Sequence, residues 1–347
     1  MRAVLFEDVG SLSVGEYPEP SIQAPGDAVV DVSTAAICGS DLHLLHGRIP
    51  GMRPHSVIGH EFVGTVRAVG DGVSRFSPGD RVVGSFLIAC GSCWFCRRRE
   101  YTNCEDLNVL GYGMFTGDLD GAQAEQVRVP NADLNLHAVD DSLSDEQAIF
   151  AGDILTTGAY ICARTGLSEG DTVAVIGAGP VGIFTIMHAL ATKPAAVYAV
   201  DMAADRLVLA EKLGAVPIDG SKVNPVVELQ RRTGERGVDV VIECVGAPAA
   251  FGTALDAVRA GGTIGVIGVY AELSYDFPLG EVWRRGVTLV MGGTCNVQGH
   301  WDRSLELVRT GAIDPTIIIT HTLGLDEAIR GYELFESREA MKVILKP

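Results

Sequence analysis

Residues 172–182 read TVAVIGAGPVG, and they carry the strongest signal for the fold of the second half of the chain. Its first five residues predict a buried strand, and a helical segment follows the glycines. A G-x-G-x-x-G pattern is weak evidence alone, but the position between a strand and a helix is the one a dinucleotide needs. There the first glycine permits a tight turn, the second lets a pyrophosphate approach, and the third lets helix and strand pack closely. The predicted cofactor-binding residues are Gly177, Gly179, Pro180, Val181 and Gly182.

An acidic residue ends the next predicted strand and bears on the choice of dinucleotide. Asp201 lies nineteen residues beyond Gly182. A carboxylate there accepts hydrogen bonds from the adenosine ribose and repels the 2′-phosphate of NADP. Arg206 follows five residues later and is in reach of the same ribose. The alternative for Asp201 is a solvated residue at a strand end; we expect NAD, and comparable turnover with NADP would argue against it.

Strands and helices alternate from about residue 153 onward, which is typical of a doubly wound parallel sheet. The predicted strands are 172–176, 196–200, 238–243 and 263–268. The predicted helices between them are about 180–192, 204–213 and 249–258. The residues before this region contain short apolar strands between glycine and proline breaks, so they form a β-rich domain.

The end of the chain is expected to return to the β-rich domain. A helix at about 301–309 precedes the apolar strand 342–345, which completes that domain most simply. We therefore predict an α/β protein with a β-rich domain at 1–153, a Rossmann domain at 154–294, and a returning segment at 295–347.

Four cysteines lie within fifteen residues, with the spacing C-x2-C-x2-C-x7-C. They are Cys90, Cys93, Cys96 and Cys104. This density indicates a metal site or cross-links, and the alternatives to zinc are a redox pair, a disulfide knot and an iron–sulfur cluster. In the ferredoxin pattern the fourth cysteine follows after three residues and precedes proline, whereas here it precedes Glu105. We predict a structural zinc held by a lobe at 89–105.

A second group of metal-ligating residues is spread along the chain. Cys38 opens the segment Cys-Gly-Ser-Asp-Leu-His, and His60 stands in a Gly-His-Glu segment before a predicted strand. A catalytic zinc needs three protein ligands and an open position, and Asp153 is the third candidate. Each of the three residues would be unremarkable alone.

The chain resembles the zinc-dependent medium-chain alcohol dehydrogenases over essentially its whole length. The matching motifs are Cys38-Gly39-Ser40-Asp41-x-His43, Gly59-His60-Glu61-x-x-Gly64, Gly79-Asp80-Arg81-Val82, the cysteine lobe and the glycine pattern at 177–182.

The resemblance implies a GroES-like catalytic domain around the cofactor domain, and two zinc ions per chain. It makes Cys38, His60 and Asp153 the ligands of the catalytic zinc. Aspartate as third ligand is similar to the secondary-alcohol and glutathione-independent formaldehyde dehydrogenases, although this chain is short for the second group. Subunits of the family form dimers or tetramers by joining their cofactor-domain sheets, so we expect a homodimer or homotetramer.

Alcohol oxidation removes a proton and a hydride, and zinc assists by lowering the pKa of the alcohol. Ser40 is suited to accept the proton. The resemblance implies its transfer through the ribose hydroxyls of the cofactor to His43, which releases it to water. Glu61 either binds zinc or tunes the field behind it. The resemblance also places Thr157 against the nicotinamide and Phe86 in the wall of the substrate pocket. Asp41 is expected to orient His60.

The composition excludes some partners. The net charge of −17 argues against nucleic acids and anionic membranes, in spite of the arginines at 97–99. No apolar run is long enough to span a membrane, and the acidic residues after the first strand interrupt any signal peptide, so we expect a cytoplasmic protein. Its partner is then a small alcohol, aldehyde or ketone.

Two other functions stay open. One is a catalytically silent dinucleotide-binding protein on the same scaffold, and the other is a zinc-free quinone or enoyl reductase. The complete set of predicted zinc ligands argues against both.

Overall fold

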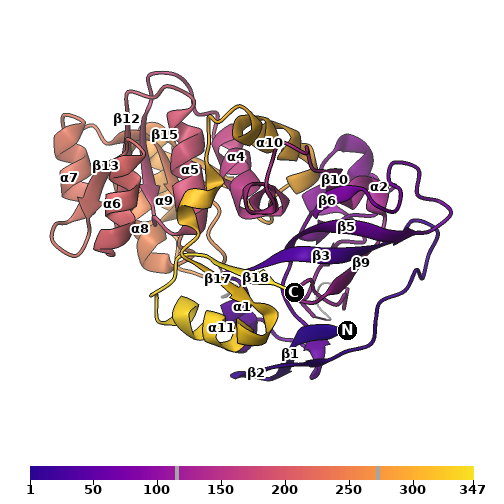
Figure 1. Cartoon of the computed structure of the whole chain (residues 1–347). Helices are drawn as coiled ribbons and strands as arrows, with labels where there is room; N and C mark the ends of the chain where they lie inside the picture. Colours follow the sequence, from indigo (N-terminus) through magenta and orange to yellow (C-terminus); the bar gives the residue numbers. More distant parts are fainter. Residues whose placement is uncertain (114–116, 271–273) are drawn as a thin grey trace. The chain divides into compact units, whose positions relative to one another are not determined.

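The computed structural model describes residues 1–113, 117–270 and 274–347, and the chain divides into two compact units (Figure 1). The first unit comprises residues 1–156 and 296–347, and the second comprises residues 157–295. Each unit has its own apolar core, whose side chains are almost fully buried.

The second unit is built around a parallel sheet. In its described part the strand order is β13-β12-β11-β14-β15-β16. The chain therefore leaves β11 first toward one edge of the sheet and then returns to build the other, so the direction of winding reverses beside β11. In sheets of this kind ligands bind at the carboxyl ends of the strands, at this reversal. The strands are β11 (Thr172–Ile176), β12 (Ala196–Asp201), β13 (Val216–Asp219), β14 (Val238–Glu243), β15 (Val258–Val266) and β16 (Thr288–Met291).

Helices connect these strands, and the predicted doubly wound α/β fold is confirmed. One boundary was wrong. We predicted a helix to residue 258 and a strand at 263–268, but the helix ends at Ala257 and β15 already starts at Val258. The strand includes Gly261 and Gly262, which lie before the predicted start. The helices are α5 (Pro180–Leu190), α6 (Ala204–Lys212), α7 (Pro225–Arg232), α8 (Pro248–Ala257) and α9 (Leu279–Arg285).

The first unit is rich in antiparallel strands. Its larger sheet has the described order β10-β6-β5-β3-β18-β17, with β9 also paired to β3. The strands are β3 (Ala28–Ile37), β5 (Glu61–Val69), β6 (Arg81–Gly84), β9 (Gln126–Val129), β10 (Leu136–Ala138), β17 (His321–Gly324) and β18 (Val343–Lys346). A smaller sheet contains β1 (Arg2–Asp8), β2 (Ser11–Glu16) and β4 (Ser56–Val57), and β7 (Leu87–Ile88) pairs with β8 (Asn108–Val109).

The C-terminal segment contributes directly to the larger sheet. β18 pairs antiparallel with β3, with Val343 opposite Ile37, and it pairs in parallel with β17 on its other side. The segment also forms α10 (Trp301–Arg309) and α11 (Ala328–Glu336), and Figure 1 shows α11 beside β17 and β18. The remaining helices are α1 (Asp41–Leu45), α2 (Ala132–Asn135), α3 (Asp145–Ala148) and α4 (Ile154–Arg164), the last of which continues into the second unit.

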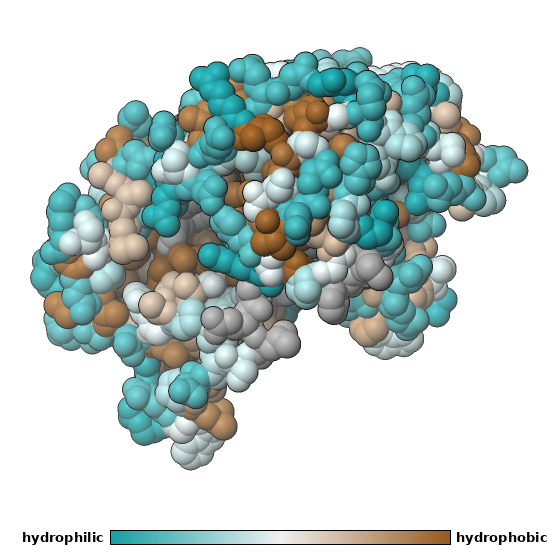
Figure 2. Space-filling model, turned by 90° about the horizontal axis from the view of Figure 1, so that it is seen from below, coloured by the Kyte–Doolittle hydropathy of each residue, from teal (hydrophilic) through white to brown (hydrophobic). Residues whose placement is uncertain are grey.

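Hydrophilic side chains cover most of the face in Figure 2, with hydrophobic side chains in small groups between them. Among the described helices none has the length and apolar character needed to cross a bilayer.

Candidate metal centres and dinucleotide site

The first candidate metal centre lies where neighbouring elements of the first unit meet. Cys38 directly follows β3 and His60 directly precedes β5. These strands are antiparallel neighbours in which Ala36 pairs with Glu61, so the end of one strand meets the start of the other. Asp153 joins them from the turn before α4. The pairing of β3 with β5 thus brings Cys38 close to His60.

The three side chains form a buried cluster of metal-ligand atoms. Their ligand atoms all lie within 4.8 Å of one another. His60 Nε2 lies 3.3 Å from Asp153 Oδ2, and Cys38 Sγ lies 3.8 Å from the same oxygen. Tetrahedral zinc with bonds of about 2.0–2.3 Å places its ligand atoms roughly 3.3–3.8 Å apart. Both of these distances therefore fit zinc.

The charges of the cluster also favour a cation. Burial lowers the pKa of His60, but the nearby carboxylates of Asp41 and Asp153 outweigh this effect and raise it well above its usual value. Without a metal ion, the two carboxylates thus favour a positively charged imidazole. A bound metal ion would supply that positive charge instead. On its other side, His60 Nδ1 lies 3.2 Å from Asp41 Oδ1.

The predicted proton-transfer residues stand on or beside α1. Ser40 Oγ lies 3.4 Å from His60 Nε2, at the cluster itself. His43 is half-buried, and burial, Arg48 and His46 lower its pKa. Among the described contacts no hydrogen bond joins the side chains of Ser40 and His43. A proton path between them therefore needs a further group.

Glu61 is fully buried and ion-paired with Lys342 of the C-terminal segment. Burial raises the pKa of Glu61 to about 7, although Lys342 opposes this shift. Its other oxygen, Oε1, makes no hydrogen bond to any described residue. Glu61 is not one of the three residues that converge in the cluster.

Two aromatic rings border the cluster. The ring centroid of Phe86 lies 6.0 Å from that of His60, and the Tyr112 ring meets His60 edge-on at 5.8 Å. The Tyr112 hydroxyl donates a hydrogen bond to the backbone oxygen of Ser40, at 3.0 Å. Phe86 thus lies beside the cluster, and its place in a substrate pocket stays a prediction. Tyr112 was not predicted.

The four cysteines of the lobe form the second candidate metal centre. Their sulfur atoms also lie within 4.8 Å of one another. The pairs Cys90–Cys96 and Cys93–Cys104 are separated by 3.9 and 4.0 Å, so none of the four is in a disulfide. Four zinc–thiolate bonds of about 2.3 Å give a sulfur–sulfur distance of about 3.8 Å.

Backbone amides point at these sulfur atoms, as expected for thiolates. Cys90 Sγ accepts hydrogen bonds from the backbone N–H groups of Ser92 and Cys93, at 3.5 and 3.4 Å. Although burial opposes them, these bonds lower the pKa of Cys90 to about 6. Cys104 Sγ accepts from the backbone N–H groups of Cys90 and Asp106, although burial raises the pKa of this thiol. The donor set and its spacing fit a structural zinc.

The second unit holds the predicted dinucleotide residues at the carboxyl end of β11. Gly179 caps α5, and Pro180 is the first helical residue. A Cβ atom at position 182 would lie 1.8 Å from the carbonyl oxygen of Gly177, so this position requires glycine. The helix can approach the strand closely only because that side chain is missing. In this fold the N-terminus of such a helix receives a phosphate of the dinucleotide.

Asp201 is held at the tip of β12 by backbone amides. Its Oδ2 accepts from Ala178 N–H at 2.7 Å, and its Oδ1 accepts from Met202 and Ala203 N–H at 2.7 and 2.9 Å. The guanidinium of Arg206 lies 3.9 Å from Oδ2. The structure thus fixes the carboxylate beside the glycine turn. Thr157 is buried on α4.

Comparison with known proteins places this geometry in a family. The model of the alcohol dehydrogenase GroES-like domain matches residues 24–141, and that of the zinc-binding dehydrogenase matches residues 180–310. An uncharacterized zinc-type alcohol dehydrogenase-like protein of Bacillus subtilis is 37% identical, over 100% of both chains. The chain belongs to the zinc-dependent medium-chain alcohol dehydrogenase family. It is accordingly an oxidoreductase of this family.

Solved structures of similar proteins agree with this assignment. An alcohol dehydrogenase from Thermus sp. ATN1 has 47% sequence identity and a TM-score of 0.96, covering 100% of this chain and 99% of that one. A candidate zinc-binding dehydrogenase from Sinorhizobium meliloti, bound to NADP, has 30% identity and a TM-score of 0.88, covering 100% and 99%.

Sequence reasoning missed four residues around the first centre of this alcohol dehydrogenase family member. Tyr112 is partly buried, and the other three are buried: Gln123, Tyr332 and Lys342. One signal was available for Lys342, because a lysine next to the apolar run Val343–Leu345 needs a buried partner. No comparable signal marks the other three.

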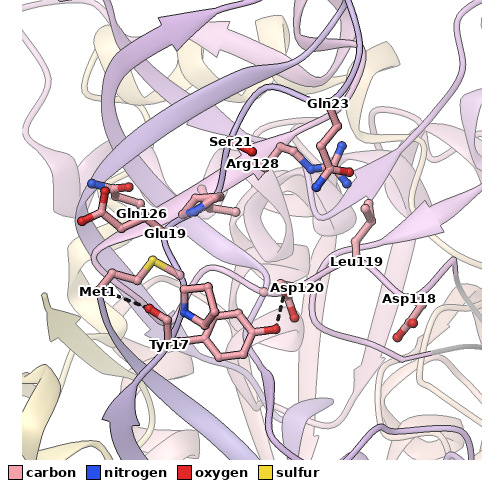
Figure 3. Close-up of a pocket in the computed structure, with 14 residues that line it drawn as sticks. Met1, Tyr17, Glu19, Ser21, Gln23, Asp118, Leu119, Asp120, Gln126 and Arg128 are labelled. Atoms are coloured by element: carbon pink, nitrogen blue, oxygen red, sulfur yellow. Dashed lines mark hydrogen bonds between the residues drawn. The ribbon is translucent and has the colours of Figure 1, made fainter.

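A cavity of about 310 Å³ lies elsewhere in the first unit (Figure 3). Tyr17 and Arg128 line it, and the Tyr17 hydroxyl donates to Asp120 Oδ2 at 2.9 Å. None of the residues that line this cavity belongs to either candidate metal centre.

Proposed function

We propose that this chain catalyses zinc-dependent hydride transfer between NAD(H) and an alcohol with its aldehyde or ketone. The observation that carries the proposal is the buried convergence of Cys38, His60 and Asp153, with the hydroxyl of Ser40 beside it. We further propose two zinc ions per chain, one held by these three residues and one by the four cysteines of the lobe.

The proposed reaction removes a hydride from the alcohol carbon and a proton from its hydroxyl group, which leaves a carbonyl. A bound zinc ion would supply Lewis acidity that lowers the pKa of the alcohol, and NAD would accept the hydride. Ser40 Oγ takes the proton. The ribose hydroxyls of a bound dinucleotide would link Ser40 to His43, and His43, whose pKa is lowered by its surroundings, passes the proton to water. Phe86 and Tyr112 exclude water beside His60. Glu61, paired with Lys342, places a buried carboxylate–ammonium pair behind the ligands.

The fixed carboxylate of Asp201 supports NAD over NADP. In this fold an acid at the tip of the second strand meets the ribose hydroxyls, and it repels a 2′-phosphate. Arg206 could attract that phosphate, but its guanidinium already faces Asp201. The similar structure from Sinorhizobium meliloti is bound to NADP, so activity must be measured with both dinucleotides.

A screen of primary and secondary alcohols with NAD and with NADP, together with zinc analysis, tests this function. We expect dinucleotide reduction with NAD at least about tenfold faster than with NADP, and close to two zinc ions per chain. A zinc-loaded protein that oxidises no alcohol and reduces no carbonyl would favour the silent dinucleotide-binding alternative. Comparable turnover with NADP would refute the proposal that Asp201 selects NAD.

Ser40→Ala should slow alcohol oxidation about 10²-fold or more and leave the zinc content unchanged. The variant removes the proton acceptor without removing a predicted ligand. Ser40→Thr keeps a hydroxyl and should retain most of the activity. Steady-state rates and zinc analysis of both variants check this, and full activity of Ser40→Ala would exclude the proposed proton transfer.

We also propose that two copies associate through the β16 edge of the second unit. β15 is paired on both sides, whereas no described strand pairs with the outer side of β16. The preceding helix α9 exposes Leu279 and Trp283, the latter by 80%. An apolar group beside an unpaired strand edge favours association. Analytical ultracentrifugation should give a molar mass of two or four times 36.7 kDa. A stable monomer would contradict the proposal.

A further inference from the structure

A chain of buried polar contacts leads from the C-terminal segment to the first metal centre. The Tyr332 hydroxyl lies 2.8 Å from Gln123 Oε1, and Gln123 Nε2 donates to Asp41 Oδ2 at 3.2 Å. Asp41 Oδ1 in turn faces His60 Nδ1 at 3.2 Å. All four side chains are buried, with exposures of 0–3%.

The contacts of Gln123 determine the direction of these hydrogen bonds. Its Nε2 group donates to Ala36 O and to Asp41 Oδ2, at 3.0 and 3.2 Å, which uses both amide protons. Its Oε1 can then only accept, and the Tyr332 hydroxyl is the donor in reach. Tyr332 therefore holds the amide with its nitrogen, rather than its oxygen, toward the carboxylate of Asp41.

Asp41 is fixed from several sides by groups that are not metal ligands. Its Oδ2 also accepts from Cys38 N–H at 3.0 Å and lies 3.3 Å from the Tyr332 hydroxyl. Neither Asp41 Oδ1 nor His60 Nδ1 has a hydrogen-bond partner elsewhere in the described chain. The carboxylate is thus left with one oxygen directed at the imidazole.

Gly59 makes room for this arrangement. Its φ is +88°, and a Cβ atom there would lie 2.3 Å from Gln123 Cγ. The residue before His60 must therefore be small for Gln123 to reach Asp41. A glycine in the metal-site motif thus serves the residue that supports the site.

We propose that Tyr332 and Gln123 are positioning residues of the metal site, which hold Asp41 so that His60 keeps one orientation and one tautomer. The inference rests on the proposed zinc site and adds the C-terminal helix α11 to its support. Groups that orient a metal-bound histidine commonly change metal affinity about 10–100-fold when removed.

The test measures how fast zinc leaves the substrate-free, dinucleotide-free protein in excess chelator. Tyr332→Phe removes one hydroxyl and should speed release from the Cys38 site about tenfold. Release from the cysteine lobe should not change, and a Cys38→Ala variant identifies that phase. Tyr17→Phe is the matched control, because it removes a tyrosine–aspartate hydrogen bond in the same unit, at the cavity of Figure 3.

Faster release in Tyr332→Phe alone supports the proposal. Release equal to that of the unchanged protein, or equally accelerated in Tyr17→Phe, overturns it.

If Tyr332→Phe does not fold, Gln123→Glu is judged by the same criteria, because its carboxylate cannot donate to Asp41. After cobalt substitution, the visible absorption of the Cys38 site should shift in the Tyr332→Phe variant, and an unchanged spectrum counts against the proposal. A protein with no zinc at Cys38 to begin with would instead refute the proposed function.

Discussion

Replacing Cys38 with alanine should remove one zinc ion per chain and lower kcat/KM for alcohol oxidation at least about 10³-fold. That loss corresponds to about 4 kcal/mol of transition-state stabilisation, the order expected when a Lewis acid is lost. The physical reason is that His60 and Asp153 alone offer too few ligands for zinc in a site built for three. Metal analysis and steady-state kinetics of the purified variant measure both effects.

Cys162→Ala is the matched control for this experiment. Cys162 is also a buried thiol, but its Sγ contacts the Thr185 carbonyl in the second unit and it belongs to neither metal cluster. It should keep both zinc ions and nearly full activity. A Cys38→Ala variant with unchanged kcat/KM would remove the basis for zinc-assisted chemistry at this site.

The second large effect concerns the cysteine lobe. Cys104→Ala should lose the other zinc ion and expose the lobe to trypsin after the arginines at 97–99, which are all on the surface. The lobe has little apolar core of its own, so the energy that holds it is mainly that of metal binding. We expect cleavage to be at least about tenfold faster than in the unchanged protein. Timed proteolysis and mass spectrometry of the fragments would show it.

The Cys38→Ala variant is the natural comparison for this result. It loses zinc from the other site and should be cleaved in the lobe at the unchanged rate. A Cys104→Ala protein that keeps two zinc ions, or resists trypsin as before, would show that the lobe is held by something other than a metal.

The sequence allowed the fold class to be predicted because its signals are local. The apolar strand before Gly177 and the repeated alternation of strands and helices are enough to predict a doubly wound sheet. β13 and α7 were not predicted, since β13 is short and contains Pro217, which weakens a strand pattern. The start of β15 was misplaced because Gly261 and Gly262 look like a break.

The candidate site was predictable only in part. Cys38 and His60 are adjacent to strands, and the structure brings them together with Asp153; their role as zinc ligands stays a prediction. The residues behind them depend on long-range pairing. Lys342 meets Glu61 across 281 positions because β18 inserts beside β3, and no local pattern contains that information. Tyr332 and Gln123 were missed for the same reason.

X-ray diffraction from crystals of the protein, recorded just above the zinc absorption edge, would locate the metal ions. We expect two anomalous peaks per chain, one between Cys38 Sγ, His60 Nε2 and the Asp153 carboxylate, and one among the four sulfur atoms of the lobe. A zinc-replete crystal with no peak at the first position would contradict this expectation.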